Sequence, residues 1–164
     1  MDIKIETERL ILRRLREEDA QDIFVNYATD EEVTKYLTWN VHENIILTKS
    51  LLHGWIEEDD KDYPNITRFG ITLNGEDKVI GAIDLVKDGD NYEIGYVLSR
   101  KYRNKGIMSE ALNAFLKYLR TLGYKNVPIK AQVDNAASNK VISKFNPKFL
   151  GEEEIYLPFK KKKV

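Results

Sequence analysis

The residues best suited to chemistry gather in a basic turn, SRKYRNKG, which stands directly before a helical pattern. The turn holds four cations and a glycine: Arg100, Lys101, Arg103, Lys105 and Gly106. A helix that begins near Ile107 leaves the N–H groups of its first turn unpaired, and its dipole favours negative charge there. Gly106 has no side chain, so the backbone can approach a ligand closely. The turn is therefore a candidate site for a phosphorylated ligand, and a pyrophosphate would satisfy both conditions.

Two common phosphate motifs are absent from the sequence. No Walker A pattern ending in Gly-Lys-Ser/Thr occurs, and no triple-glycine dinucleotide fingerprint follows a strand pattern. A nucleoside triphosphatase and a dinucleotide-dependent oxidoreductase are therefore disfavoured. On spacing alone, a solvated basic turn whose glycine relaxes the backbone explains the residues equally well, because short glycine motifs often match by chance. The surrounding segments are needed to distinguish a phosphate-binding turn from a solvated basic turn.

Those segments are predicted to form a strand, a helix, a second strand and a short helix. Residues 92–98 have the alternation of a strand. The helix after the turn has apolar residues at helical spacing: Met108, Ala111, Leu112, Phe115, Leu119 and Leu122. Gly123 stands where a helix C-cap belongs. Residues 127–133 are predicted to be a strand, and Asp134 or Asn135 to cap the short helix.

The N-terminal half supplies the remaining elements. Alternating apolar residues predict a first strand over Ile3 to Leu15, and helical spacing predicts helices between residues 17 and 60. The polar stretch EEDDKDYPN predicts a loop, and three strands follow, joined by turns at Asn74-Gly75 and Asp88-Gly89-Asp90. This order predicts a single domain over residues 1–164, of the α/β or α+β class with a mixed sheet.

Composition excludes several classes of function. The 26 Lys and Arg residues against 27 Asp and Glu residues give a net charge of -1, so no overall field attracts nucleic acid. The chain has no Cys, which excludes disulfides and a cysteine nucleophile. No run approaches the ~18 apolar residues of a membrane span, and we expect a cytoplasmic protein without a membrane partner. His42 and His53 have no third ligand at metal spacing, so we expect no metal site.

The segment YEIGYVLSRKYRNKGIMSEAL, followed by AQVDNAASNKVISKF, resembles the acyl-CoA-binding core of the GNAT N-acetyltransferase superfamily. Together with TERLILRRLREEDAQDIF, this core is similar to the branch that contains the ribosomal-protein N-terminal acetyltransferases. The resemblance covers nearly the whole chain. It implies a GNAT-like fold, in which helices flank a splayed central sheet, and a function in transferring an acetyl group from acetyl-CoA to an amine.

The resemblance also implies which residues bind acetyl-CoA. The pyrophosphate would lie against the loop and helix start: Arg103, Asn104, Lys105, Gly106, Ile107, Met108 and Ser109. Met108 replaces a small residue of the family pattern, and its helical phase predicts a side chain that points into the core. Pantetheine would insert between the strand 92–98 and its parallel neighbour 127–133, with contacts to the backbone of Val97 and Leu98. Asn135 would also contact pantetheine.

The catalytic residues implied by the resemblance are Ser138 and Glu93. Ser138 would lie near the thioester sulfur and protonate the leaving thiolate, or water would do so, because the Tyr that many relatives carry four residues later is Ile142 here. Glu93 is the favoured general base, and Asp84, one strand earlier, is the alternative. Structural explanations stay open for these residues, since Asn135 and Ser138 suit a helix start and strand carboxylates often face solvent.

The acceptor amine is constrained by its pKa. At pH 7, an α-amine with a pKa near ~8 costs about 1 kcal/mol to deprotonate, whereas a lysine amine near ~10.4 costs about 4 to 5 kcal/mol. We therefore expect an α-amine of a protein N-terminus or small molecule, while lysine, polyamine and aminoglycoside acceptors stay open. Tyr36, Trp39 and Trp55 are candidates to line the acceptor cleft, although aromatic residues on helices are more often core.

The C-terminus departs from the family pattern. Asn146 and Pro147 replace the usual Gly-Phe, and a single strand over Phe149 to Phe159 is predicted where relatives have two. The last strand would then be missing, altered or supplied by a partner in a homodimer. This departure, with Ile142, keeps a second hypothesis open: a noncatalytic acyl-CoA-binding or regulatory module. A nucleic-acid-binding domain that uses the basic turn and the KKKK tail is disfavoured by the net charge.

Overall fold

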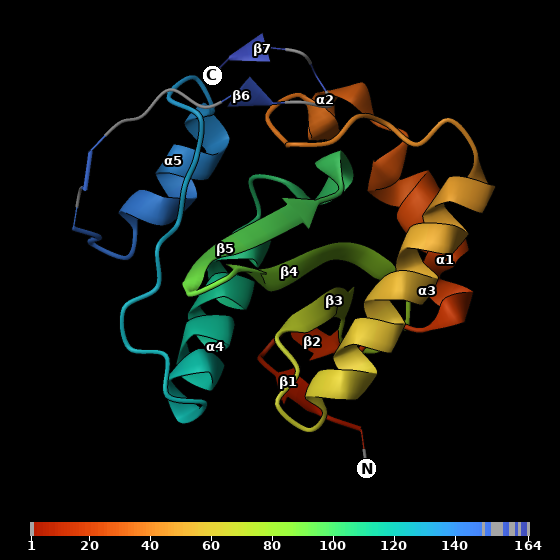
Figure 1. The fold of residues 1–164 in the computed structure, drawn as a ribbon, viewed down its shortest axis with the longest axis horizontal. Coiled ribbons are helices and arrows are strands. Elements are labelled where there is room, and N and C mark those ends of the chain that lie inside the picture. Colours follow the sequence, from red (N-terminus) through yellow and green to blue (C-terminus); the bar gives the residue numbers. More distant parts are fainter. Residues whose placement is uncertain (1, 149, 152–155, 158–159, 161, 164) are drawn as a thin grey trace.

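An antiparallel sheet of five strands, in the order β1-β2-β3-β4-β5, lies at the centre of the structure, a computed structural model (Figure 1). The structure describes residues 2–148, 150–151, 156–157, 160 and 162–163. The strands are β1 (Lys4–Glu6), β2 (Leu10–Arg13), β3 (Arg68–Leu73), β4 (Val79–Asp88) and β5 (Asn91–Leu98). Each strand therefore pairs with the next one along the chain, and β5 stands at one edge of the sheet.

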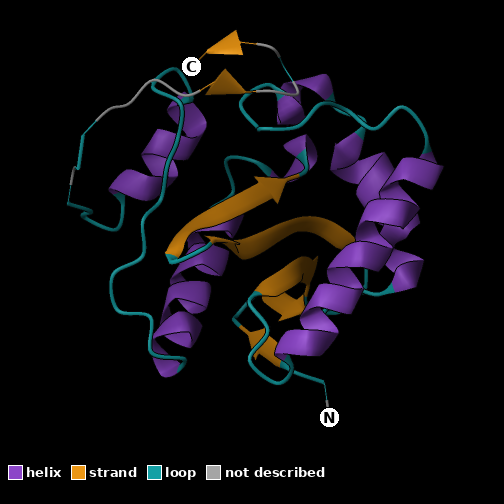
Figure 2. Ribbon diagram, viewed as in Figure 1, coloured by secondary structure: helices purple, strands orange, loops and turns teal. Residues whose placement is uncertain are grey.

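Helices cover both faces of this sheet (Figure 2). The α-helices are α1 (Ala20–Ile23), α2 (Glu31–Thr34), α3 (Ile45–Asp62), α4 (Ile107–Thr121) and α5 (Ala136–Ser143). Three short helices of other types are η1 (Glu17–Asp19), η2 (Phe24–Ala28) and η3 (Arg100–Tyr102). On one face, Leu112 and Phe115 of α4 are buried in a cluster with Phe69 of β3. On the other face, Leu52 of α3 and Ile23 of α1 are buried in a second cluster.

Most predicted elements are confirmed, and the first one is wrong. The turns at Gly75 and Gly89 are present, with φ of 88° and 60°, and Gly123 ends α4 with φ of 96°. The single strand predicted over Ile3 to Leu15 is instead the hairpin of β1 and β2. The reason is local: Thr7 donates its N–H to the carbonyl of Leu10 at 2.9 Å and accepts the Leu10 N–H on its hydroxyl at 3.0 Å.

Helix α3 continues to Asp62, into the stretch that was predicted to be a loop. The acidic residues of this stretch are compatible with a helix because Asp59, buried on α3, pairs with Arg68 of β3 at 3.0 Å. The helices predicted between residues 17 and 60 are present, except that residues 29–30 and 35–44 lie outside any helix. The longer of these two interruptions connects α2 to α3.

The strand predicted over residues 127–133 does not form. Its one ladder contact is a parallel bridge between Ile129 and Ile94 of β5, so the expected mixed sheet is antiparallel apart from that bridge in the described part of the chain. Asn135 caps α5 as predicted, by accepting the N–H of Ser138 at 3.1 Å. Asn146 takes the left-handed backbone with φ of 47°, which Asn tolerates, so the turn after α5 does not need the glycine of the family pattern.

The described residues at the C-terminus form two short strands rather than one. β6 (Tyr156–Leu157) pairs antiparallel with β7 (Lys162–Lys163), in a separate sheet that Figure 1 shows beside α2. Lys160, in the turn between them, donates its ammonium to the carbonyl of Thr34 at the end of α2. Leu150 and Gly151 of the predicted strand lie in no strand, and apart from β6 its other residues, including Phe149 and Phe159, lie outside the described residues.

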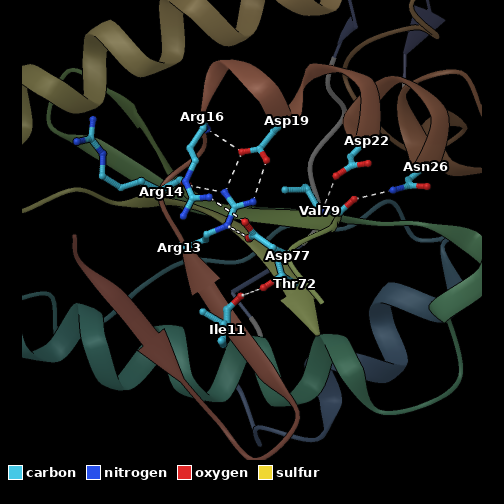
Figure 3. Close-up of polar contacts among 10 residues, drawn as sticks. All are labelled: Ile11, Arg13, Arg14, Arg16, Asp19, Asp22, Asn26, Thr72, Asp77 and Val79. Carbon is cyan, nitrogen blue, oxygen red and sulfur yellow. Dashed lines mark hydrogen bonds and ion pairs between the residues drawn. The ribbon is translucent and has the colours of Figure 1, made fainter. Parts of the chain in front are cut away.

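A buried ion pair joins the end of β2 to the helical layer (Figure 3). The Arg13 guanidinium donates to both carboxylate oxygens of Asp19, at 2.9 and 2.8 Å, and both side chains are buried. Asp19 also accepts the N–H of Arg16 at 2.7 Å, and Arg13 reaches the exposed Asp77 at 2.6 Å. Because a charge left alone in the interior is costly, each partner requires the other.

We expect Asp19→Ala to lower the free energy of unfolding by about 3 kcal/mol, because it leaves Arg13 with the exposed Asp77 as its carboxylate partner. The matched control is Asp77→Ala, which removes the exposed partner of the same guanidinium and is expected to cost less than about 1 kcal/mol. Urea denaturation at neutral pH measures both values. Equal losses in the two variants would contradict the role given to the buried pair.

Candidate active site

The basic turn lies at the N-terminus of α4, as predicted. Gly106 is the N-cap and takes the left-handed backbone, with φ of 74°, and Asn104 does the same with φ of 61°. The first helical hydrogen bond of α4 joins the N–H of Glu110 to the carbonyl of Gly106 at 3.1 Å. The N–H groups of residues 107–109 therefore come before the helical ladder. Three amides at the positive end of a helix suit a diphosphate.

The turn is held by Arg9, which the sequence analysis missed. The Arg9 guanidinium donates to the carbonyl of Lys105 at 2.8 Å and to Glu110 of α4 at 2.7 Å. A Cβ on Gly106 would lie 3.4 Å from the same guanidinium. The Glu110 carboxylate also accepts the hydroxyl of Thr7 at 2.6 Å and the N–H of Arg9 at 2.9 Å. Burial acts to raise the pKa of Glu110, but these hydrogen bonds outweigh it and lower the pKa.

The cations of the turn differ in their surroundings. Arg100 pairs with Asp30, the N-cap of α2, at 3.1 Å, so its charge is already partnered. Lys105 is exposed, with its ammonium 5.7 Å from the ring centroid of Tyr102. Lys144, at the end of α5, donates to the hydroxyl of Ser109 at 3.3 Å and adds a cation that the sequence analysis did not consider. The side chain of Met108 is buried, which confirms its predicted direction.

Among the described residues, one contact pairs the edge of β5 that faces residues 127–133, and the rest of this edge is open. The N–H of Ile94 bonds the carbonyl of Pro128 at 2.9 Å, next to the bridge between Ile94 and Ile129. Backbone groups alternate in direction along an antiparallel strand. Tyr96 and Leu98 therefore direct their N–H and C=O groups to the same open edge as Ile94, whereas those of Val97 point to Ala82 of β4. The open edge leads toward the basic turn and suits an extended ligand chain.

The candidate catalytic residues lie on two opposite faces of the sheet. Asp84 lies opposite Gly95 in the register, so it shares a face with Glu93 and with Arg68 of β3. This is the face of α3, since Arg68 contacts Asp59 there. A Cβ on Gly95 would lie 2.9 Å from the Asp84 carboxylate, so the glycine makes room for that side chain.

The surroundings of the Asp84 carboxyl group raise its pKa. Burial raises its pKa, the Arg68 guanidinium at 3.9 Å lowers it, and Asp59 raises it again, which brings the pKa to about 6. Burial likewise raises the pKa of Asp59 to about 6, although Arg68 opposes it. Glu93 differs, because one of its oxygens lies 3.7 Å from the Lys130 ammonium. Asp84 thus has the pKa expected of a general base that works near pH 7.

On the opposite face, the hydroxyl of Ser138 is hydrogen-bonded to the phenol of Tyr96. Tyr96 packs against the same core cluster as Ile94 and Leu98, on the side of α4. The N–H of Ser138 is bonded by the Asn135 side chain, so the structural explanation for Asn135 holds, whatever else its amide contacts. Tyr96 could not be selected from the sequence, because nothing in the EIGY segment distinguishes it from a core tyrosine.

The aromatic and histidine residues considered as candidates contact other parts of the fold. Trp39 and Trp55 pack against the second core cluster, while the carbonyl of Tyr36 accepts the Gln132 amide at 3.3 Å. His42 bonds Thr48 at 2.7 Å, and burial lowers the pKa of His42. His53 bonds Glu17 at 2.7 Å, which raises the pKa of His53.

Within the described ranges, no three His, Asp or Glu side chains form a group suited to a metal ion. No helix in those ranges is both long and apolar enough to cross a bilayer.

Known proteins with a similar sequence are acetyltransferases. The profile of the family described as "Acetyltransferase (GNAT) domain" matches residues 9–146. The chain is 31% identical over 143 residues to an uncharacterized N-acetyltransferase, YnaD, of Bacillus subtilis, and the match covers 85% of this chain and 79% of that protein.

Solved structures share the fold. An acetyltransferase of the GNAT family from Bacillus anthracis superposes with a TM-score of 0.79 and 27% identity, over 96% of this chain and 92% of that one. A ribosomal L7/L12 alpha-N-protein acetyltransferase, RimL, in complex with coenzyme A, superposes with a TM-score of 0.77 and 23% identity, over 94% and 88% of the two chains. The chain therefore belongs to the GNAT family and is an acetyl-CoA-dependent N-acetyltransferase.

Proposed function

We propose that this single domain transfers the acetyl group to an α-amine, of a protein N-terminus or a small molecule, by direct attack in a ternary complex. The observation that carries the proposal is the open edge of β5, which has the Asp84 carboxylate on one face of the sheet and the Ser138 hydroxyl on the other. An amine and a thioester that meet at this edge would have a proton acceptor and a proton donor on opposite sides. Such positioning supplies much of the rate in a two-substrate reaction.

The cosubstrate would be held by backbone groups. The N–H groups of residues 107–109, with Arg103, Asn104, Lys105 and Gly106 before them, would bind the diphosphate. The outward N–H and C=O groups of Tyr96 and the C=O of Leu98 would pair with pantetheine, and Asn135 would lie beside it. Val97 contributes its side chain rather than its peptide groups, because these point to β4. When bound, acetyl-CoA supplies the activated acyl group.

The residues of this chain would then move two protons. Asp84 takes a proton from the acceptor amine through a water, for which its partly buried carboxyl is better suited than Glu93 beside Lys130. The N–H of Leu98 donates to the carbonyl oxygen as negative charge develops there. Ser138 gives its proton to the sulfur. Glu93 stays the second candidate for the base, on the same face as Asp84.

Two arguments support an α-amine acceptor. A base with a pKa of about 6 is weak, and it matches an amine whose pKa is near ~8 better than a lysine amine near ~10.4. RimL, described as an alpha-N-protein acetyltransferase, shares the fold at 23% identity. The rival hypothesis, a noncatalytic acyl-CoA-binding module, is motivated by Ile142, which provides no hydroxyl where many relatives have a Tyr.

The acceptor is tested with two peptides of one sequence, of which the first has a free N-terminus and an acetylated lysine and the second the reverse. We expect release of free thiol from acetyl-CoA at pH 7 to be faster with the free N-terminus, because its amine is more easily deprotonated. A small-amine panel with a polyamine and an aminoglycoside runs in parallel. Faster release with the lysine peptide would overturn the preference, and acetyl-CoA binding without thiol release from any amine would favour the noncatalytic module.

The base is tested by pH profiles of Asp84→Asn and Glu93→Gln. A base must be deprotonated to act, so the wild-type kcat is expected to rise as pH passes through about 6, the pKa of Asp84. Asp84→Asn should lower kcat about 100-fold and remove this rise. Glu93→Gln should keep the rise with a smaller loss. The opposite pattern would assign the base to Glu93.

The diphosphate site is tested by Gly106→Glu, with Gly106→Ala as its control. Both variants place a side chain on a left-handed residue and carry about 1 to 2 kcal/mol of strain. Only Glu adds bulk and a negative charge, so acetyl-CoA should bind Gly106→Glu roughly 100-fold more weakly than Gly106→Ala by calorimetry. Thermal melts report whether both variants fold. Equal affinity of the two folded variants would place the diphosphate elsewhere.

A further inference from the structure

We propose that Tyr96 is a positioning residue, whose phenol directs the Ser138 hydroxyl toward the sulfur that leaves in acetyl transfer. The inference rests on the proposed function and deepens it, because it names the group that makes Ser138 an effective donor. It starts from one contact: the phenol oxygen of Tyr96 on β5 and the hydroxyl oxygen of Ser138 on α5 are hydrogen-bonded, although the two residues lie 42 positions apart.

The positions of both side chains are fixed by their elements. Tyr96 is at the open edge of β5, and its side chain packs on the core cluster between the sheet and α4. Ser138 is in the first turn of α5, where its N–H is bonded to Asn135 at 3.1 Å. The strand thus fixes one oxygen and the helix cap fixes the other. The pair stands beside the edge along which pantetheine is proposed to lie.

The direction of this hydrogen bond follows from acidity. A phenol, with a pKa near ~10, is a stronger donor than an aliphatic hydroxyl, and its oxygen is a weaker acceptor. Tyr96 therefore donates and Ser138 accepts. Burial raises the pKa of Tyr96, which keeps the phenol protonated at neutral pH. Ser138 has one O–H, and since its oxygen is already occupied by the Tyr96 proton, that O–H is free to point at the sulfur.

The proton balance is then complete. As the carbon–sulfur bond breaks, its electron pair stays on the sulfur, and Ser138 gives its proton there. The Ser138 oxygen takes the Tyr96 proton. When the products leave, the amine proton that Asp84 holds passes to solvent, and solvent returns a proton to the phenolate. Hydrogen bonds in such a chain strengthen one another, so Ser138 is a better acid with Tyr96 than without it. Tyr96 thus supplies from β5 the phenol that Ile142 does not supply from α5.

The test is a double-mutant cycle of Tyr96→Phe and Ser138→Ala, read as kcat and KM with a working amine. Ser138→Ala is expected to lower kcat about 100-fold, and Tyr96→Phe about tenfold, without a change in KM for acetyl-CoA. The double variant should match Ser138→Ala, because Tyr96 acts only through Ser138. The matched control is Tyr118→Phe, which removes another partly buried phenol that donates to the carbonyl of Ile66 at 2.8 Å, away from this site.

Each outcome bears on the inference. An unchanged kcat for Tyr96→Phe, or a tenfold further loss in the double variant, would overturn it, because Tyr96 would then act independently of Ser138. A raised KM with unchanged kcat would also overturn it and make Tyr96 a packing or binding residue. If the wild-type protein released no thiol with any amine, the proposed function would fail as well. Normal wild-type turnover with additive losses would sink only the role of Tyr96.

Discussion

The open edge of β5 is the constraint on which the site depends. An unpaired strand edge exposes a row of N–H and C=O groups that would otherwise pair with a neighbouring strand. Here one parallel bridge, between Ile94 and Ile129, starts such a pairing, and no further ladder contact is present in the described residues. The chain beyond the bridge is held by other bonds, from Gln132 to Tyr36 and from Asn139 to Gln132. These bonds keep it in place without closing the edge.

The elements around this open edge are held by many bonds. The other side of β5 is fully paired with β4, from Asn91 to Leu98. The turn that leads into α4 is held by Arg9 and Glu110, so the amides proposed to bind the diphosphate are positioned by the β1–β2 hairpin as well as by the turn. On the opposite face, the Arg13–Asp19 pair holds the helical layer against the sheet. A site built on such supports needs little rearrangement to bind its ligand.

Local patterns were sufficient for the elements with strong periodicity and clear end signals. Helix α4, its Gly123 terminus, the meander and the Asn135 cap belong to this group, because each depends on residues close in sequence. The contacts that build the site could not be predicted this way. Arg9 and Glu110 lie 101 positions apart, and Tyr96 and Ser138 lie 42 apart. Residues 127–133 have the composition of a strand. A β-ladder also needs a neighbouring strand that runs alongside over the whole length, and the sequence does not show whether β5 does so.

Among the described residues, the carboxyl groups with a shifted pKa form two groups, one with a lowered and one with a raised pKa. Hydrogen bonds lower the pKa of Asp77 and of Glu110, so these groups stabilise the fold above their unfolded pKa and lose that effect as pH falls. Burial raises the pKa of Asp59 and Asp84 to about 6, so the native state binds their protons more tightly than the unfolded chain does. Their contribution therefore becomes less favourable as pH rises from about 4 to about 6. Asp59 and Asp84 are therefore ionised at neutral pH at a cost in stability, and for Asp84 this cost is compatible with the base that we propose.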